Sequence, residues 1–300
     1  MRPADAPVSE VTPAFVSHER AHITAHARRL RRHLARHARR HDDAARVPRE
    51  IADRLLEHLG PVRLVPGAVL DLGAATGDLR RGLLRRYPRS RVISLDPGLE
   101  RLRQGLGPAW RRLLASPAFA CAEDHALPLR AASVDIVCCN LALTWSADLP
   151  GALSECRRVL RAGGLIMLST LGPDTLKELR TAWAQVDGWV HTGTFPDMHD
   201  IGDALLAARF ADVVVDAESL QVEFDDLDHL LHETRSAGPG NLSVGRNAGL
   251  TTAARMRRLR AAYVSTGAGV GCRATVEAVY AHAWAPDPAG LAVAAPTRRA

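Results

Sequence analysis

The 300-residue sequence predicts an α/β fold in which a mostly parallel β-sheet is covered by helices on both faces. Three observations lead to this prediction. Short apolar segments alternate with amphipathic ones through the middle of the chain, a loop of small residues follows the first apolar segment, and acidic or amide side chains follow several others. Together they are typical of an α/β domain that binds its ligand at the carboxyl ends of parallel strands.

Strands and helices are predicted to alternate from residue 68 onward. Short apolar runs, typical of strands, occupy residues 68–72, 91–95, 119–122, 133–140, 165–170, 213–216, 220–224 and 275–284. Longer runs with helical spacing of apolar residues occupy residues 78–87, 99–106, 150–160, 174–186, 201–208, 227–237 and 251–263. The Arg-Ala-Gly-Gly segment at 161–164 predicts a turn.

The two ends of the chain differ from this pattern. Residues 1–16 contain three prolines and no periodicity, which predicts a loose tail, and residues 17–46 predict a polar helix. Apolar residues at helical spacing then predict an amphipathic helix at 48–60, which Gly60-Pro61 ends. The Ala/Pro-rich residues from Ala285 onward predict a frayed end.

The net charge of +6 is unevenly distributed. Residues 18–49 carry ten arginines against Glu19, Asp42 and Asp43, which indicates either an acidic partner or a solvated basic helix. Aromatic residues make up only 4% of the chain, so few are available to stack on bases and we expect no nucleic-acid partner.

The sequence predicts a cytoplasmic protein that does not enter a membrane. No apolar run approaches the ~20 residues that a membrane span needs, and the N-terminus lacks the apolar core of a signal peptide. Its Arg-rich start is similar to a mitochondrial transit peptide, but Asp5, Glu10 and Glu19 argue against one. The five cysteines form no C-x-x-C pair and predict buried thiols.

The loop of small residues follows a strand that ends in Asp71. Gly73, Ala75 and Gly77 give the spacing G-x-A-x-G, which differs from the G-x-G-x-x-G of dinucleotide-binding enzymes. Small residues let the backbone approach a ligand closely. Asp71 and Asp78 on either side of the loop would repel a pyrophosphate. S-adenosylmethionine has no phosphate and carries an ammonium and a sulfonium, so the loop favours this cofactor, the alternative being an ordinary tight turn.

Polar side chains follow the next three predicted strands. Asp96 stands where a carboxylate can accept hydrogen bonds from both ribose hydroxyls. Glu123 and Asp124 follow the third strand and are predicted to accept from the adenine amino group. Asn140 and Leu141 end the fourth strand, where the methionine part and the methyl group should lie.

Histidines recur at i, i+4 spacing in the polar N-terminal helix. They are His18, His22, His26, His33, His37 and His41. Such spacing is compatible with a metal site, but the helix is rich in arginine and offers no pattern for a third ligand. We therefore interpret these histidines as a solvated helix face and expect no metal.

Residues 65–172 resemble class I S-adenosylmethionine-dependent methyltransferases. From about residue 31 to 285 the chain also resembles a narrower family, the malonyl-acyl-carrier-protein O-methyltransferases of biotin synthesis. The segments that carry this resemblance are REIADRLL at 49–56, NLALTW at 140–145, STLGPDTLKELR at 169–180, FPDMHDIG at 195–202 and ATVEAVYAHAW at 274–284.

The resemblance implies a Rossmann-like, seven-stranded sheet and three regions of the chain. Residues 1–47 would form a tail and an Arg/His-rich helical lid, residues 48–285 the methyltransferase domain, and residues 286–300 a flexible tail. Within the domain, residues 225–272 would form a helical insertion before the last strand that helps to roof the substrate site. Ala75 replaces the middle glycine of the loop, which is tolerable if its φ is negative.

The resemblance also implies methyl transfer from S-adenosylmethionine to the free carboxyl of a malonyl group on acyl carrier protein. A carboxylate is already ionised at neutral pH, since its reference pKa is about 4. The protein must then desolvate the carboxylate and align it with the methyl carbon. The arginines at 28–40 or 255–260 are candidates for docking the carrier protein, and the sequence leaves the oligomeric state open.

Three residues are candidates for the reaction itself. Arg180 is expected to hold the malonyl group, unless it pairs with Asp174 or Glu178 on its own helix. Trp145 is expected to wall the methyl pocket, or else to pack in the core. His41 stands where the family's lid has a tyrosine, and Leu34 where it has a phenylalanine. Phe195 and His199 are further candidates for lining the substrate channel.

Two other functions remain compatible with the sequence. A family of mitochondrial complex I assembly factors that hydroxylates an arginine resembles this chain, including the D-T-L-x-E-L-R segment. A module that binds S-adenosylmethionine without catalysis is the other alternative.

Overall fold

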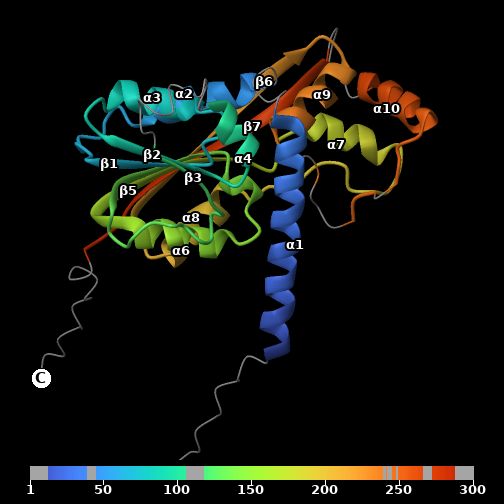
Figure 1. The fold of residues 1–300 in the computed structure, drawn as a ribbon. Coiled ribbons are helices and arrows are strands. Elements are labelled where there is room, and N and C mark those ends of the chain that lie inside the picture. Colours follow the sequence, from blue (N-terminus) through green and yellow to red (C-terminus); the bar gives the residue numbers. More distant parts are fainter. Residues whose placement is uncertain are drawn as a thin grey trace, which may run out of the picture.

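The computed structural model describes residues 13–38, 45–105, 118–238, 241, 245–247, 249–265 and 272–287. The described strands form one seven-stranded sheet in the order β3-β2-β1-β4-β5-β7-β6 (Figure 1). Its strands are β1 Ala68–Leu72, β2 Arg91–Asp96, β3 Ala118–Cys121, β4 Val134–Asn140, β5 Leu160–Leu171, β6 Ala211–Phe224 and β7 Cys272–Trp284. β1 to β5 are parallel, and β7 is antiparallel to both β5 and β6. The predicted α/β class with a mostly parallel sheet is confirmed.

Helices cover both faces of this sheet (Figure 1). They are α1 Pro13–His37, α2 Arg46–His58, α3 Asp78–Arg86, α4 Leu99–Gly105, α6 Leu149–Val159, α7 Lys177–Ala184, α8 Met198–Ala207, α9 Leu227–Ala237 and α10 Ala253–Ser265, with a short 3-10 helix η2 at Leu143–Trp145. α2 and α3 lie on one face and α6 and α8 on the other. α9 and α10 come between β6 and β7 in the chain, where a helical insertion was predicted.

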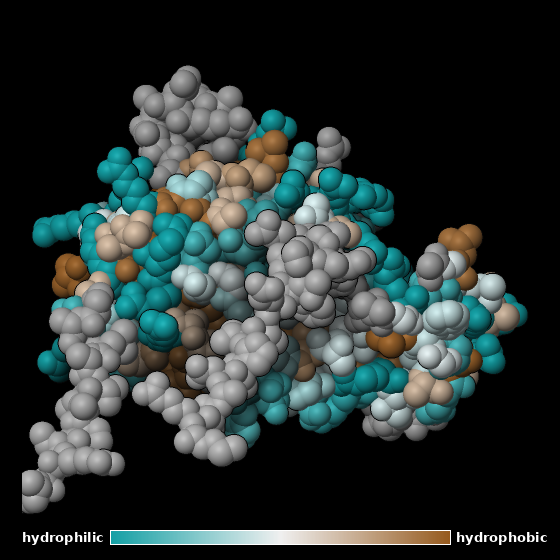
Figure 2. Space-filling model, turned by 90° about the horizontal axis from the view of Figure 1, so that it is seen from below, coloured by the Kyte–Doolittle hydropathy of each residue, from teal (hydrophilic) through white to brown (hydrophobic). Residues whose placement is uncertain are grey.

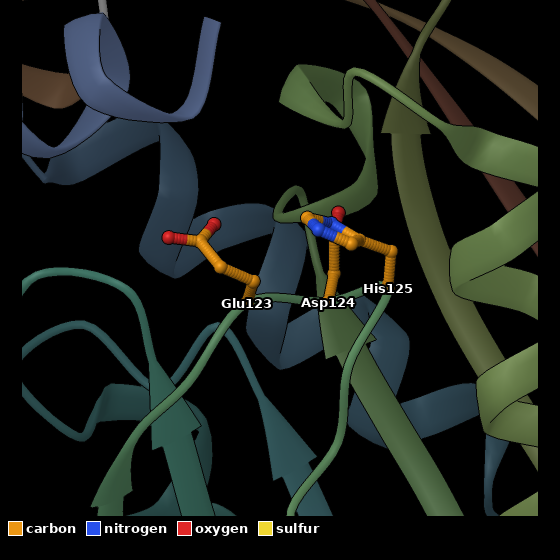
Figure 3. Close-up of side chains that lie close together, drawn as sticks. All are labelled: Glu123, Asp124 and His125. Atoms are coloured by element: carbon orange, nitrogen blue, oxygen red, sulfur yellow. The ribbon is translucent and has the colours of Figure 1, made fainter. Parts of the chain in front are cut away.

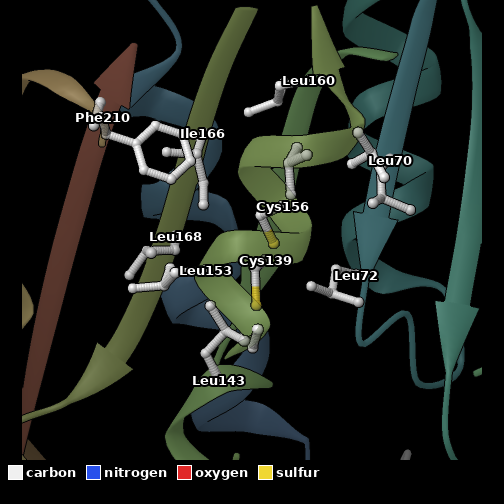
Figure 4. Packing of buried hydrophobic residues seen from close by; sticks show 14 of the residues in the cluster. Leu70, Leu72, Cys139, Leu143, Leu153, Cys156, Leu160, Ile166, Leu168 and Phe210 are labelled. Carbon is white, nitrogen blue, oxygen red and sulfur yellow. The ribbon is translucent and has the colours of Figure 1, made fainter. Parts of the chain in front are cut away.

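The alternation of side chains along the strands produces two cores. On one face, Leu70 of β1 and Ile166 of β5 pack with Leu153 and Cys156 of α6 (Figure 4). On the other face, Val69 of β1 belongs to a cluster with the buried leucines of α2 and α3. Since successive residues of a strand point to opposite faces, apolar runs such as Val69-Leu70 supply both cores at once.

A third hydrophobic cluster lies where β6 and β7 extend beyond the parallel strands. Leu179 of α7, Leu230 of α9 and Leu259 of α10 pack there with Phe224 and Ala274. α7, α9 and α10 therefore form a separate helical layer next to the carboxyl ends of the parallel strands (Figure 1).

α1 runs beside this layer, and its N-terminal half extends away from the rest of the molecule (Figure 1). It begins at Pro13, so the prediction of a loose tail through residue 16 is wrong at its end. None of the described helices is both long enough and apolar enough to span a membrane. On the face drawn in Figure 2, hydrophobic residues form separate groups among hydrophilic ones.

Several predicted boundaries differ from the structure. α7 begins at Lys177 because Leu176 has a left-handed backbone, with φ 58°, which a helix cannot include. The predicted turn at 161–164 belongs to β5, whose pairing with β4 is irregular there. β6 is one continuous strand, since its long antiparallel pairing with β7 passes through the predicted gap at 217–219.

The cysteines mostly match their prediction. The five thiols are free, and four of them are buried. Cys121, at the end of β3, is exposed, so the prediction of a buried thiol is wrong there. Burial raises the pKa of the Cys139 thiol to about 12, so it stays protonated at neutral pH.

Candidate functional site

A cavity lies at the carboxyl ends of β1, β2 and β4. The loops that follow these strands line it through Ala75, Pro97 and Leu141, among other residues. α1 contributes Leu30 and Leu34, and the helices of the insertion contribute Leu230, Glu233 and Thr234 of α9. The site therefore lies between the sheet and two helices that are distant in sequence.

The loop after β1 needs its first glycine. Gly73 has φ 78°, and a Cβ at this position would lie 2.1 Å from the Cβ of Ala142. Its N–H donates to the Leu95 carbonyl oxygen at 2.7 Å, which holds the loop against the end of β2. Only glycine fits this close approach of two backbone segments.

Ala75 does not have the negative φ that we expected. Its φ is 48°, in the left-handed region that side chains other than glycine seldom occupy. The Ala75 N–H donates to Asp96 Oδ2 at 2.9 Å, and this hydrogen bond stabilises the unusual conformation. The residue lines the cavity as predicted.

Asp96 is 2% exposed and lines the cavity at the end of β2. Its Oδ2 accepts from Ala75 and its Oδ1 accepts from the Gly98 N–H at 2.7 Å. Each carboxylate oxygen has a second lone pair. Asp96 is therefore rigidly held and can still accept hydrogen bonds from a pair of ribose hydroxyls, which fits its predicted role.

Asp71 and Gly77 do not line the cavity, although we predicted that both bind the cofactor. Asp71 follows Val69 by two residues, so its side chain points to the same face of the sheet, which α3 covers, and there Ser94 Oγ donates to its Oδ2 at 3.0 Å. Complete burial raises the pKa of Asp71 to about 7, against the opposing effects of Ser94 and Arg80. Gly77, with φ 92°, is the N-cap residue of α3.

The second acid next to the loop, Asp78, is also compensated. It lines the cavity, but Arg49 donates to its Oδ2 at 3.1 Å and Arg81 pairs with its Oδ1. The negative charge that we attributed to the two acids beside the loop is therefore largely cancelled. Asp96 instead contributes the carboxylate that can still contact a cofactor.

Glu123 and Asp124 line a smaller recess that shares Gly73, Pro97 and Trp145 with the main cavity. Glu123 points toward the side of α1 and pairs with Arg31 (Figure 3). Asp124 Oδ1 lies 3.1 Å from Nδ1 of His125. Both acids therefore stand beside the cavity at the end of β3, where we predicted the adenine group.

The same three residues are close enough to ligate a metal. One ligand atom each from Glu123, Asp124 and His125 lie within 4.8 Å of one another. The contact between Glu123 and Arg31 competes with such a role, because it brings a cation to one of the three ligands.

Asn140 and Leu141 line the cavity at the end of β4, as predicted. Asn140 Nδ2 donates to the Pro48 carbonyl oxygen at 2.9 Å and its Oδ1 accepts from Ser169 Oγ at 2.8 Å. Leu141 has φ 58°, and its N–H donates to the Ser169 carbonyl oxygen at 3.1 Å. Asn140 thus connects the end of β4 to the start of α2.

Trp145, which we expected either at the methyl pocket or in the core, is half-buried and lines the cavity. Its ring lines the cavity and meets the Phe195 ring edge to face, with centroids 5.7 Å apart. Nε2 of His26 in α1 donates to the Trp145 carbonyl oxygen at 2.9 Å. Phe195 lines the cavity too, whereas His199 is exposed in α8 and lines none of the described cavities.

Arg180 lies in α7 and is not among the residues that line a described cavity. Its Nη2 donates to the carbonyl oxygens of Pro173 at 2.5 Å and Thr175 at 3.4 Å. Asp174 pairs with Lys177 and Glu178 accepts from Thr275 instead. Its role in holding the malonyl group therefore stays a prediction.

The lid residues are only partly described. His41 lies outside the described residues, so its predicted place near the reaction is not tested. Leu34 is buried and lines the cavity next to Gly98. Leu30, four residues earlier, lies on the same face of α1 and lines the cavity as well; this spacing of apolar residues in a polar helix is a signal that we did not use.

Comparisons with known proteins agree with the fold. Residues 70–168 match the family model described as "Methyltransferase domain". The YcgJ protein of Bacillus subtilis has a similar fold, with a TM-score of 0.55 at 14% identity over 79% of this chain and 99% of that one.

Two curated relatives cover most of the chain. The malonyl-[acyl-carrier protein] O-methyltransferase of Halorhodospira halophila is 43% identical over 81% of this chain and 83% of its own length. That of Gallionella capsiferriformans is 42% identical over 83% of this chain and 87% of its own length. The chain therefore belongs to the malonyl-[acyl-carrier protein] O-methyltransferase family, and it is an S-adenosylmethionine-dependent methyltransferase.

Proposed function

We propose that this protein transfers the methyl group of S-adenosylmethionine to the free carboxylate of malonyl-acyl carrier protein, a step of biotin synthesis, in the cytoplasm. The observation that supports this most is the cavity at the ends of β1, β2 and β4, which joins a cofactor cradle to an aromatic wall. The cradle consists of the Gly73 loop and Asp96, and the wall of Trp145 and Phe195. The names of the relatives supply the acceptor.

The cofactor fits the residues at the strand ends. Asp96 would accept from the ribose hydroxyls, and Glu123 or Asp124 from the adenine amino group. Leu141 and Asn140 would contact the methionine part at the end of β4. When bound, S-adenosylmethionine supplies an electrophilic methyl group on a sulfonium.

The protein's own contribution to the reaction is placement and exclusion of water. The malonyl carboxylate needs no base, because it is ionised at neutral pH. Trp145, Phe195 and Leu176 line the cavity with apolar surface, which would strip water from the carboxylate and raise its reactivity. Leu30 and Leu34 of α1 also line the cavity, so α1 would act as a lid over the cofactor.

We propose that Arg180 acts as a positioning residue. It binds the Pro173 and Thr175 carbonyl oxygens, and Thr175 lines the cavity. The guanidinium would thus fix the turn before α7 in the shape that the acceptor needs. His41 remains a candidate for the reaction at the position of the family's lid tyrosine.

The experiment is to incubate the protein with S-adenosylmethionine and malonyl-acyl carrier protein and to measure the mass of the carrier protein. The expected product is the methyl ester of the malonyl group. Acetyl-acyl carrier protein is the control, because it lacks the free carboxylate and should stay unchanged. Intact cofactor binding without an ester would contradict this function and favour a binding module.

A further inference from the structure

A second cavity lies next to the cofactor cavity. It is bordered by α7, α9, the segment 190–195 and the residues Asn241, Arg246, Asn247 and Thr251. The two cavities share four lining residues, Trp145, Leu176, Phe195 and Thr234. The aromatic pair of Trp145 and Phe195 therefore stands between the cofactor and a further space that the cofactor does not need.

The lining of the second cavity combines polar and apolar side chains. Hydrogen-bonding side chains of Thr192, Asn241 and Asn247 line it, and Leu179 and Trp183 supply apolar surface. Such a lining suits an extended chain that contains amide groups, because amides need hydrogen-bond partners while the methylene groups between them prefer apolar contact.

Two arginines of this cavity have no acidic partner among the described residues. Arg246 is half-buried, and its backbone is fixed by a β-bridge to Val190. Arg235 is exposed, and only its carbonyl oxygen accepts a hydrogen bond, from Nε2 of His33. By contrast, Arg255 and Arg260 of the neighbouring α10 pair with Asp187 and Asp228. Because these two guanidinium groups have no acidic partner among the described residues, they can bind an anion in the cavity.

The residues that line the second cavity differ in their exposure to solvent. Thr251, which also lines the cavity, is exposed, whereas Thr192 is buried. An occupant that enters beside Thr251 and reaches the cofactor cavity has to pass the Trp145–Phe195 pair, because this pair lines both cavities. The cofactor cavity itself is covered by α1 and α9, so a large acceptor protein needs a separate entrance for its reactive group.

We propose that the second cavity binds the phosphopantetheine arm of the carrier protein, with Arg246 and Arg235 at its phosphate. The arm carries a phosphate at its outer end, two amides along its length and the malonyl thioester at its inner end. The cavity offers arginines for the phosphate and hydroxyl and amide side chains for the amides, and the Trp145–Phe195 pair lies beside the cofactor cavity, where the thioester would have to end. The inference rests on the proposed function, since only a substrate on such an arm requires this entrance.

The test measures binding without turnover. The protein, loaded with S-adenosylhomocysteine, is titrated by calorimetry with malonyl-phosphopantetheine and with malonyl-pantetheine, which lacks only the phosphate. The wild-type protein should bind the phosphorylated thioester about tenfold more tightly or better, as expected for a hydrogen-bonded charge pair. Arg246→Ala should bind the two thioesters equally.

A matched control separates this effect from general charge. Arg258→Ala removes an exposed arginine of α10 that lines none of the described cavities, and it should keep the full preference for the phosphorylated thioester. An equal affinity of the wild-type protein for both thioesters would overturn the inference, as would an unchanged preference in Arg246→Ala.

The two proposals can fail separately. An ester formed on malonyl-acyl carrier protein together with phosphate-independent binding would remove the arm site and keep the methyl transfer. Phosphate-dependent binding without any ester would support the arm site and contradict the methyl transfer. With both intact, Arg246→Ala should raise KM for malonyl-acyl carrier protein about tenfold and leave the affinity for S-adenosylmethionine unchanged.

Discussion

The Ala75 N–H donates to Asp96 Oδ2 at 2.9 Å, and this hydrogen bond joins the loop after β1 to the end of β2. The contact does two things at once. It stabilises Ala75 at a φ of 48°, and it fixes a carboxylate that lines the cavity. The loop after β1 and the end of β2 thus line the same cavity for the cofactor.

Asp96→Ala should weaken the binding of S-adenosylmethionine by about 1.5–3 kcal/mol, because the ribose hydroxyls would lose a charged acceptor. Calorimetric titration measures the affinity, and circular dichroism checks that the fold is intact. Glu100→Ala, in the exposed first turn of α4, is the control and should bind normally. Unchanged affinity in folded Asp96→Ala would remove Asp96 from the site.

Gly73→Ala should destabilise the protein by about 1–3 kcal/mol, as for other overpacked positions. The new methyl group would lie 2.1 Å from the Cβ of Ala142. Chemical denaturation measures the loss. The double variant Gly73→Ala/Ala142→Gly removes the opposing methyl group and should recover part of the stability. A single variant that is as stable as the wild type would show that Gly73 and Ala142 do not lie this close to each other.

Asp71 should make stability depend on pH. The pKa of its carboxyl is about 7 in the folded protein, compared with an ordinary value of 3.8. Between pH 3.8 and pH 7, the carboxyl is protonated in the folded protein and ionised in the unfolded chain, so unfolding releases a proton. The free energy of unfolding should therefore fall as the pH rises from about 4 to 7, by an amount on the order of a few kcal/mol.

Comparison with Asp71→Asn isolates this effect. The variant keeps the shape of the side chain and has no proton to lose, while all other groups titrate as in the wild type. Its stability relative to the wild type should increase between pH 5 and pH 8, measured by urea denaturation at each pH. A constant difference between the two proteins would show that Asp71 is not buried as an acid.

Trp145→Ala should lower kcat with malonyl-acyl carrier protein by about tenfold or more, because water would reach the carboxylate and its alignment would loosen. Trp189 is the matched control, since it is 49% exposed and lines none of the described cavities. Steady-state kinetics of Trp145→Ala and Trp189→Ala give the comparison. Equal kcat values for both variants would mean that Trp145 only packs against Phe195.

Arg180→Ala should raise KM for malonyl-acyl carrier protein several-fold and cost about 1 kcal/mol of stability, since two hydrogen bonds to the turn before α7 are lost. Arg180→Lys retains one donor group and should recover part of both effects. A loss of stability with normal KM would reduce the residue to a purely structural contact.

Much of the fold and the cofactor side of the site could be predicted from local patterns. Short apolar runs specify buried strands, and the carboxyl ends of parallel strands lie at one edge of the sheet, so Asp96 and Asn140 could be placed on either side of the end of β1 from their positions alone. The same logic put Asp71 at the cofactor, but its side chain does not line the described cavity. Asp71 is the last residue but one of β1. Because side chains alternate between the two faces along a strand, its side chain lies on the face of the sheet that α3 covers.

The substrate side was harder to predict because it depends on long-range contacts. The left-handed Leu176 that delays α7 has no local sequence signal, and β6 continues through a polar stretch because β7 pairs with it. The second cavity combines α7, α9 and the loop of Arg246, which only tertiary packing brings together. Arg246 therefore drew no attention in the sequence, whereas Arg180 did because it lies in a recognisable segment.

The most direct test of the central claim follows the methyl group itself. S-adenosylmethionine labelled with ¹³C in its methyl group is incubated with the protein and malonyl-acyl carrier protein, and the product is analysed by nuclear magnetic resonance. We predict an O-methyl ester signal on the malonyl group and an equal amount of S-adenosylhomocysteine. A label that stays on S-adenosylmethionine, or that appears on carbon or nitrogen, would contradict the claim.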